Sequence, residues 1–270
     1  MAPSDFSDAA LHAARYALYL AAGSGARLHL VHVGETGDVP PAIPLEALRT
    51  MLQPTGEETA VEIELHEATG APADALLLLI DELTPDLVVI GRSGKGRGEA
   101  EGIFAGSVAQ KLALRATVPI LIVPEAAVLP PHLHRILYAS DFRKGVGHNL
   151  AYLRERFAHL DPEIHCLHLI EPNETQYYHD ELASIEAELQ AIVESEAGVP
   201  DVTYKVMRGY TLVEGLQHYA AEHHIDVLVF CPRRRNLFSF WYQRSTTARF
   251  VRHSDIPVLT LPQKIIFPVA

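Results

Sequence analysis

The chain is expected to fold as an α/β protein with two tandem, doubly wound (Rossmann-like) domains, each holding a mainly parallel, five-stranded sheet flanked by helices. Three observations predict this class. Strand patterns alternate with helix patterns, which is typical of a parallel sheet covered on both faces. The same order of patterns occurs twice along the chain. The length of 270 residues suits two domains of about 130 residues each.

Hydrophobic periodicity in the first half predicts a regular succession of helices and strands. The predicted helices cover Ser7 to about Ala22, Leu45–Leu52, Pro72–Leu83 and Ser107–Leu114. The predicted strands cover Arg27–Val33, Val61–Leu65, Leu87–Ile90 and Pro119–Val123. Almost nothing precedes Asp5, so the first strand of this half is expected to be truncated.

The second half gives the same signals in the same order. The repeated segments are Ala2–Phe6 and Arg135–Phe142, Asp86–Ile90 and Asp226–Phe230, and Val118–Pro124 and Ile256–Pro262. Their spacing of about 138 residues is best explained by a domain duplication. We expect a first domain at 1–126, a second at 133–262 and a C-terminal tail at 263–270. The stiff Pro130-Pro131 segment lies between the two domains.

Composition limits the classes of function. The hydrophobic fraction of 48% and the charged fraction of 21% are those of an ordinary globular protein. No apolar run approaches the roughly 20 residues needed to cross a bilayer, and no charged-then-apolar leader precedes Ser4, so we expect a cytoplasmic protein without membrane contact. The net charge of -12 disfavours nucleic-acid binding.

Cysteines and histidines give little support for a metal site. Cys166 and Cys231 form no CxxC pair, and both are expected to be plain buried residues. In the predicted strand Ile164–Ile170, Cys166 and His168 share one face while His165 points to the other, so they form no ready-made triad. The sequence therefore predicts no metal site.

A glycine-rich segment follows the predicted strand Leu87–Ile90. It begins at Gly91 and ends with Gly106-Ser107 at the start of a helix. Glycines let the backbone approach an anion closely, and the amide groups of a helix start favour negative charge. In a doubly wound sheet this loop opens at the carboxyl ends of the strands, where ligands bind. The segment has the chemistry of a phosphate-binding loop, although a glycine-rich loop can equally be a flexible connection.

These residues resemble the universal stress protein family. Its ATP-binding members carry Gly-x2-Gly-x9-Gly-Ser/Thr after the fourth strand, an aspartate just after the first strand and a His-Val pair ending the second. The matching residues in this chain are Asp5, His32, Val33, Gly91, Gly94, Gly106 and Ser107. The resemblance covers nearly the whole chain, twice.

The resemblance implies that the first copy binds an adenine nucleotide (ATP, ADP or AMP), with or without Mg²⁺. Asp5 would lie beside the adenosine, and the backbone of Val33 would face the adenine edge. The backbone amides of Gly94, Gly106 and Ser107 would hold the phosphates.

Simpler roles remain open for some of these residues. Asp5 can be a turn residue before a helix cap at Ser7, and His32 can be a strand-end residue whose polar atoms are satisfied within the protein. Lys95 and Arg97 can reach phosphate oxygens or can be solvated loop charges.

Both copies depart from the family pattern. In the first, eleven residues instead of nine separate Gly94 from Gly106. In the second, the loop has the family length, but the glycine positions hold Cys231, Arg234 and Arg244, and only Ser245 survives. We therefore expect no nucleotide site of the family type in the second copy.

The loop Arg233–Tyr242 of the second copy is rich in arginine and aromatic residues. Its aromatic part is typical of a packing surface or a protein-partner surface. The run Arg233–Arg235 is either a solvated charged loop or an arginine fork for a carboxylate or phosphate.

These observations bear on three possible functions. The first is a cytoplasmic stress-response protein that binds an adenine nucleotide through the first copy, regulatory and at most a slow ATP hydrolase. The second is an interaction scaffold that binds no nucleotide and acts through the loop Arg233–Tyr242. The third, an adenylating ligase, would need a Ser-Gly-Gly-x-Asp loop or a GxxxxGK[ST] P-loop, and the sequence has neither.

Two expectations concern assembly. The final strands of the copies, Pro119–Val123 and Pro257–Leu261, are expected to pack as a pseudo-dimer within the chain, which can also form a homodimer. In the tail, Lys264–Phe267 resembles the strand Arg135–Tyr138. It can replace the missing first strand of the first copy, or it can be an extra edge strand or a disordered end.

Overall fold

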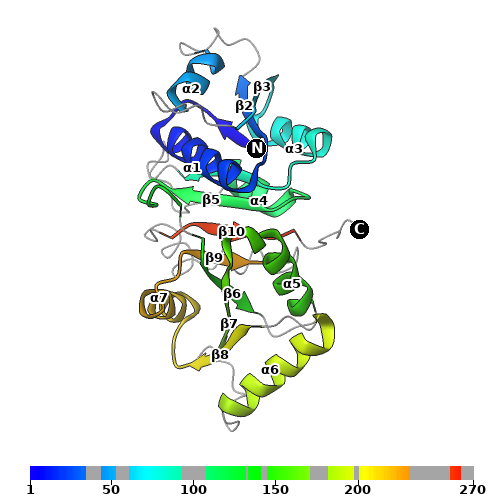
Figure 1. Ribbon diagram of the computed structural model, residues 1–270, viewed down its shortest axis with the longest axis vertical. Coiled ribbons are helices and arrows are strands. Elements are labelled where there is room, and N and C mark those ends of the chain that lie inside the picture. Colours follow the sequence, from blue (N-terminus) through cyan, green and yellow to red (C-terminus); the bar gives the residue numbers. More distant parts are fainter. Residues whose placement is uncertain are drawn as a thin grey trace. The chain divides into compact units, whose positions relative to one another are not determined.

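A computed structural model (Figure 1) describes most of the chain and divides it into two compact units. The first unit consists of Met1–Pro131 and Ser254–Pro262, and the second of His132–His253 and Gln263–Ala270. The residues described are 1–34, 44–52, 61–92, 108–131, 133–140, 145–170, 182–197, 201–231 and 256–262. In these residues no helix is long and apolar enough to cross a membrane.

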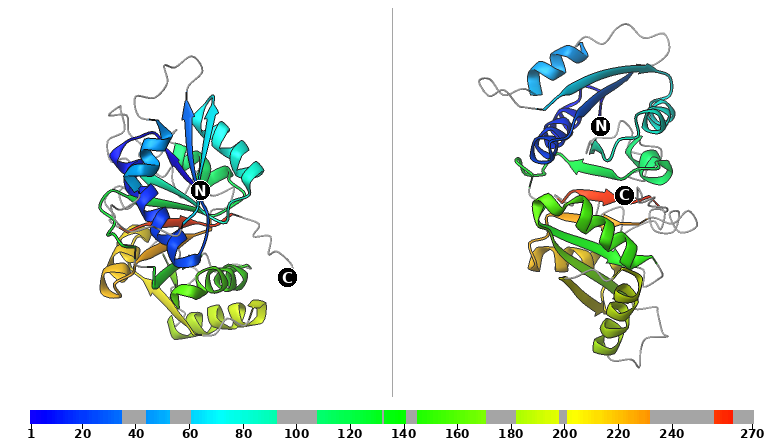
Figure 2. Two further views of the ribbon diagram at one scale, coloured as in Figure 1. Left: turned by 45° about the horizontal axis from the view of Figure 1, so that its top comes forward. Right: turned by 45° about the vertical axis from the view of Figure 1, so that its right-hand side comes forward.

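Strands and helices alternate through the first unit. Its elements are β1 (Ala2–Ser4), α1 (Asp8–Ser24), β2 (Leu28–Gly34), α2 (Leu45–Leu52), β3 (Ile63–Thr69), α3 (Pro72–Leu83), β4 (Val88–Arg92), α4 (Val108–Arg115), β5 (Ile120–Pro124) and β10 (Val258–Thr260). The sheet lies between α1 and α2 on one face and α3 on the other (Figures 1 and 2). The predicted α/β, Rossmann-like fold class is confirmed.

The strand order reverses between β1 and β4. β1, β2 and β3 are neighbours in a parallel sheet, and β4 pairs in parallel with β5. Two hydrogen bonds of Met1 link β1 with β4, because its nitrogen donates to Leu87 O (2.8 Å) and its carbonyl accepts from Val89 N (2.9 Å). The chain thus winds in one direction from β1 to β3 and in the other from β4 to β5, which creates a switch point between β1 and β4.

The first strand is short but pairs on both sides. β1 has three residues, half the length of its counterpart β6 (Arg135–Ser140). β1 pairs with β2, and the bonds of Met1 satisfy backbone groups beside β4. A missing first strand would leave backbone groups of its neighbours unpaired, and these bonds reduce the need for the tail to pair with them. The tail itself, 263–270, lies outside the described residues.

β10 belongs to the first unit through its pairing with β5. The two strands run antiparallel, with Leu259 opposite Leu121. The expected pairing of the final strands of the two copies is therefore present in these residues. The homodimer stays a prediction.

The second unit repeats the winding of the first. It contains β6, α5 (Val146–Arg156), a 3-10 turn η1 (Ala158–Leu160), β7 (Glu163–Ile170), α6 (Leu182–Ala197), β8 (Val202–Arg208), α7 (Leu212–Glu222) and β9 (Val227–Phe230). Strands β9, β6, β7 and β8 are parallel neighbours in that order. Helices α5 and α6 cover one face and α7 the other (Figure 2).

Local signals explain how α1 is placed. The Ser7 hydroxyl accepts a hydrogen bond from Ala10 N at 3.2 Å and caps the helix, and Gly25 ends it at φ 65°. The buried side of the helix is lined largely by alanines, among them Ala9, Ala13 and Ala17. These small side chains let α1 lie close to the sheet and bring its first turn next to the end of β4.

Candidate functional site

A cleft opens at the switch point of the first unit. It has a volume of about 270 Å³ and lies where the carboxyl ends of β1, β2 and β4 meet the amino ends of α1, α3 and α4. Its lining consists of Pro3, Ser4, Asp5, Ser7, Ala9, Ala10, Val31, Val33, Pro72, Leu76, Ile90, Gly91, Arg92, Val108 and Ala109. This is the general location of ligand sites in doubly wound folds.

Three helix starts at the cleft make it favourable for an anion. Ser7 caps α1, Pro72 is the first residue of α3, and Val108 is the first residue of α4. No side chain caps α3, because its N-cap residue is Ala71. Unbonded amides and the positive ends of helix dipoles attract negative charge. Arg92 adds a cationic side chain to the lining.

Asp5 holds the turn before α1 and also lies at the cleft. Its Oδ1 accepts hydrogen bonds from Ser7 N (3.0 Å) and from Ser7 Oγ (2.6 Å), as expected for a turn residue that orients a helix cap. Asp5 is also exposed and lines the cleft. Both of these bonds go to Oδ1, so the turn does not use the other carboxylate oxygen, Oδ2. That oxygen can accept a hydrogen bond from a hydroxyl group in the cleft.

Val33 lies just beyond the end of the β1–β2 pairing. That pairing stops at Ser4 opposite His32, whereas the pairing of β2 with β3 continues through Val33 opposite Ala68. Among the strands that the structure describes, none pairs with Val33 on its β1 side. A flat base with a donor and an acceptor on one edge can form strand-like hydrogen bonds there.

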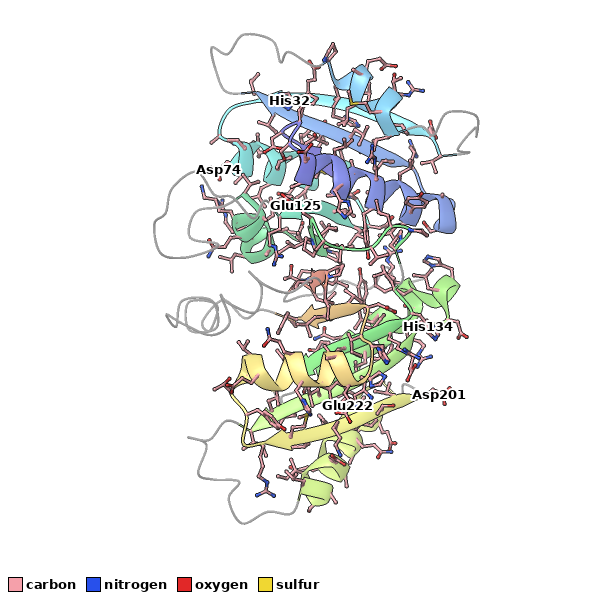
Figure 3. The ribbon with its side chains drawn as sticks, turned by 90° about the vertical axis from the view of Figure 1, so that its left-hand side faces the viewer. His32, Asp74, Glu125, His134, Asp201 and Glu222 are labelled. Atoms are coloured by element: carbon pink, nitrogen blue, oxygen red, sulfur yellow. The ribbon has the colours of Figure 1, made fainter. Side chains whose placement is uncertain are left out.

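His32 supports the turn after β1. Its Nδ1 donates to the carbonyl of Ser4 at 2.9 Å, and its ring lies 4.6 Å from the Phe6 ring. The second unit repeats the contact, with His168 Nδ1 at 3.0 Å from the Ser140 carbonyl. The simpler role for His32, a satisfied strand-end residue, is confirmed. Figure 3 labels His32 on β2 and Asp74 on α3, two of the elements that meet at the cleft.

Gly91 has a packing role that the sequence did not reveal. A Cβ atom at this position would collide with the carbonyl group of Ala9 in α1. A glycine is therefore required here for helix and strand to approach each other, whatever the ligand. Gly91 also lines the cleft.

The structure brings three predicted residues together and leaves three untested. Asp5, Val33 and Gly91 come from three strand ends and line one cleft. Gly94, Gly106 and Ser107 lie outside the described residues, as do Lys95 and Arg97. Helix α4 begins at Val108, close to the predicted start.

Two contributors to the cleft were missed by sequence reasoning. One is Arg92, whose signal is its position directly after Gly91 at the end of a strand. The other is the start of α3, which Gly70 and Pro72 mark in the sequence because Pro is favoured in the first helical turn.

In the second unit a side chain of the protein occupies a helix start. The Glu196 carboxylate accepts from Gly145 N (2.7 Å) and Gly147 N (2.8 Å) at the beginning of α5. Its side chain is only 14% exposed. The protein thus supplies its own anion at the helix that corresponds to α1. Asp141 and the loop Arg233–Tyr242 lie outside the described residues, as does Ser245.

Comparison with known proteins places both halves of the chain in one family. A profile of the universal stress protein family matches residues 1–124 and again 132–262. The chain belongs to the universal stress protein family. The two matches fit the duplicated order of elements, so the chain carries two universal stress protein copies in tandem.

Individual proteins are similar to this chain in sequence or in fold. Universal stress protein MJ0531 of Methanocaldococcus jannaschii is 30% identical over an alignment of 138 positions, and the match covers 45% of this chain and 78% of that protein. A universal stress protein structure from Archaeoglobus fulgidus has a TM-score of 0.67 at 17% identity, covering 97% of this chain and 94% of that one. A functionally unknown protein from Pseudomonas aeruginosa has a TM-score of 0.60 at 17% identity, covering 96% and 89%.

Proposed function

We propose that the first copy binds an adenine nucleotide (ATP, ADP or AMP) and that the chain is a regulatory stress-response protein rather than a strong catalyst. The observation that carries the proposal is the cleft at the switch point, where three helix starts meet Asp5, Val33 and Gly91. The cytoplasmic location expected from the sequence is part of the proposal.

Each part of the ligand has a matching part of the cleft in this proposal. The adenine edge pairs with the backbone of Val33, and the ribose hydroxyls donate to the Asp5 carboxylate. The phosphates extend toward the start of α4, where the amides of Gly94, Gly106 and Ser107 hold them, with or without Mg²⁺. The volume of about 270 Å³ lies at the small end of ligand pockets, which suits the adenosine better than a whole triphosphate.

Calorimetric titration of the full chain with ATP, ADP and AMP tests the proposal. We expect Asp5→Asn to weaken binding about 10-fold or more, because a carboxylate accepts hydrogen bonds more strongly than an amide. Asp8→Asn is the matched control, since Asp8 is an exposed residue in the first turn of α1 that does not line the cleft. A chain that binds none of the three nucleotides, or an Asp5→Asn variant that binds as well as the original, would contradict the proposal.

The same titration tests which copy binds. Gly106→Arg installs in the first copy the residue of the second and should abolish binding, because a side chain then fills the space of a phosphate. Arg244→Ala should leave binding unchanged. The reverse pattern would assign the nucleotide to the second copy. Absence of nucleotide binding in every variant would favour the alternative, an interaction scaffold acting through a protein partner at the loop Arg233–Tyr242.

A further inference from the structure

Three potential metal ligands gather on neighbouring strands of the first unit. His29 is on β2, and Glu64 and His66 are on β3. His29 lies directly opposite Glu64 in the parallel pairing, and His66 follows Glu64 by two residues. Because side chains alternate along a strand, all three project from the same face of the sheet.

The three ligand atoms form a triangle of the right size for a small cation. His29 Nδ1 is 2.9 Å from His66 Nε2 and 3.2 Å from Glu64 Oε2, and the third side, from His66 Nε2 to Glu64 Oε2, is 3.7 Å. A tetrahedral zinc ion with bonds of 2.0–2.2 Å separates its nitrogen and oxygen ligands by about 3.3 Å. A shift of a few tenths of an ångström in each side chain would therefore suffice.

The surroundings of the cluster orient its carboxylate and leave it reachable. Arg27 Nη1 donates to Glu64 Oε1 at 2.7 Å, so the other oxygen, Oε2, faces the two imidazoles. Such a contact to a ligand's second oxygen is typical of metal sites. The side chains of His29, His66 and Glu64 are 17%, 24% and 33% exposed, so an ion can enter from solvent.

The second copy shows that the fold does not impose this cluster. His165 on β7 corresponds to His29, since each lies three residues before the equivalent histidines His168 and His32. Thr203 and Lys205 occupy the places of Glu64 and His66. The His165 ring is instead bonded within the protein, to Tyr219 Oη at 2.8 Å and Glu163 Oε1 at 3.0 Å. Of the two copies, only the first has potential metal ligands at all three of these positions.

We propose that His29, Glu64 and His66 form a zinc site on the sheet of the first copy, with water as the fourth ligand. Two imidazoles and a carboxylate form a donor set that Zn²⁺ accepts, and three protein ligands with an open position are typical of an accessible site. The site differs from the sequence expectation of no metal.

The zinc site is separate from the nucleotide cleft. His29 precedes Val33 by four residues on β2, which corresponds to about 13 Å along a strand. None of the three ligands lines the cleft. The ion would join β2 to β3 and would not contact the phosphates of a bound nucleotide.

Titration of the full chain, prepared metal-free and without a polyhistidine tag, tests the proposal. We expect one Zn²⁺ per chain by calorimetry, and with Co²⁺ the visible absorption of a four-coordinate ion. His66→Gln and His29→Gln should each weaken Zn²⁺ binding about 100-fold or more, because loss of an outer-sphere partner already costs 10–100-fold.

His218→Gln is the matched control. His218 is exposed and lies 3.6 Å from Glu222 one helical turn away, and among the described residues no third ligand joins this His–Glu pair. This variant should bind Zn²⁺ like the original chain, and all variants should keep their melting temperature in the absence of metal. The proposal is overturned if the original chain takes up no stoichiometric Zn²⁺. It is overturned equally if His66→Gln and His29→Gln bind as well as the original, or if His218→Gln loses as much affinity as they do.

Discussion

At Gly91 the backbone of β4 lies so close to α1 that no side chain fits. The nearest atoms to an added Cβ belong to the Ala9 carbonyl, which is part of a helical backbone and cannot rotate away. A phosphate-binding sequence motif thus includes a position that packing alone would reserve for glycine. Because packing alone requires a glycine here, the presence of Gly91 in the family motif is weak support for ligand binding.

Gly91→Ala should destabilise the first unit by about 1–3 kcal/mol, the usual cost of inserting a methyl group into a filled space. Urea unfolding measures this loss. Gly23→Ala is the control, because Gly23 lies within α1 and an added Cβ there meets nothing within 4 Å. It should raise stability by up to about 1 kcal/mol, since alanine favours helix. Equal effects of the two substitutions would show that the contact with Ala9 is not limiting.

Residue identity was a good guide to the cleft and a poor one to the metal cluster. The resemblance to the family placed Asp5 and Val33 at the cleft, and for Val33 periodicity also identified the strand that it ends. His66 could not be predicted, because the predicted strand Val61–Leu65 stops before it. The polar residues from His66 onward break the alternation, yet β3 continues to Thr69 through its pairing with β2.

At the scale of elements, the start of α5 is held by the end of α6. Gly147 lets the two helices approach, since a Cβ there would come within 2.8 Å of the Val193 carbonyl and the Glu196 Cβ. Both oxygens of the Glu196 carboxylate then accept amide hydrogen bonds from α5. The two helices therefore stabilise each other through a charge at a helix terminus.

Glu196→Gln should lower the free energy of unfolding by about 1–2 kcal/mol, because an amide offers one acceptor oxygen where the carboxylate uses two. Thermal or urea unfolding measures the change. Glu194→Gln on the same helix is the control, since Glu194 is exposed and accepts only from the Gln190 side chain among the bonds described for it. A loss as large in Glu194→Gln would point to general helix electrostatics instead.

The order and type of the elements followed from sequence more reliably than their ends. The predicted strands Leu87–Ile90 and Pro119–Val123 are found at Val88–Arg92 and Ile120–Pro124. Helix Leu45–Leu52 has the predicted bounds. The contact between Glu196 and the start of α5 could not be predicted from the sequence, because it joins residues about 50 positions apart and depends on how two helices pack.

At the scale of the whole molecule, the two copies share a framework and differ in their polar groups. The contacts of His32 with Ser4 and of His168 with Ser140 are equivalent, so both copies keep this bond between the second strand and the end of the first. Beside it, one copy has an open cleft and the other has Glu196 at a helix start. The two copies thus share one backbone arrangement but present different polar groups at the equivalent helix start.

Leu259→Pro should weaken the pairing of β10 with β5, because proline cannot donate a ladder hydrogen bond. Leu259 is 1% exposed and lies opposite Leu121. Hydrogen exchange read by mass spectrometry should show faster exchange in β5 and little change in β7. Leu259→Val is the control and should leave β5 protected. Unchanged protection of β5 in Leu259→Pro would mean that this pairing adds little to the first unit.

The membership of β10 in the first unit also affects how the protein is made. Residues 1–131 leave the ribosome before the strand at Val258–Thr260 has been translated, so β5 lacks its antiparallel neighbour during that interval. At bacterial and eukaryotic synthesis rates of about 5–20 residues per second, the delay is roughly 6–26 seconds. For that time the nascent chain presents an apolar strand with one unpaired edge, a surface that chaperones recognise and that other nascent chains can join. A stop codon between residues 131 and 258 would make that exposure permanent.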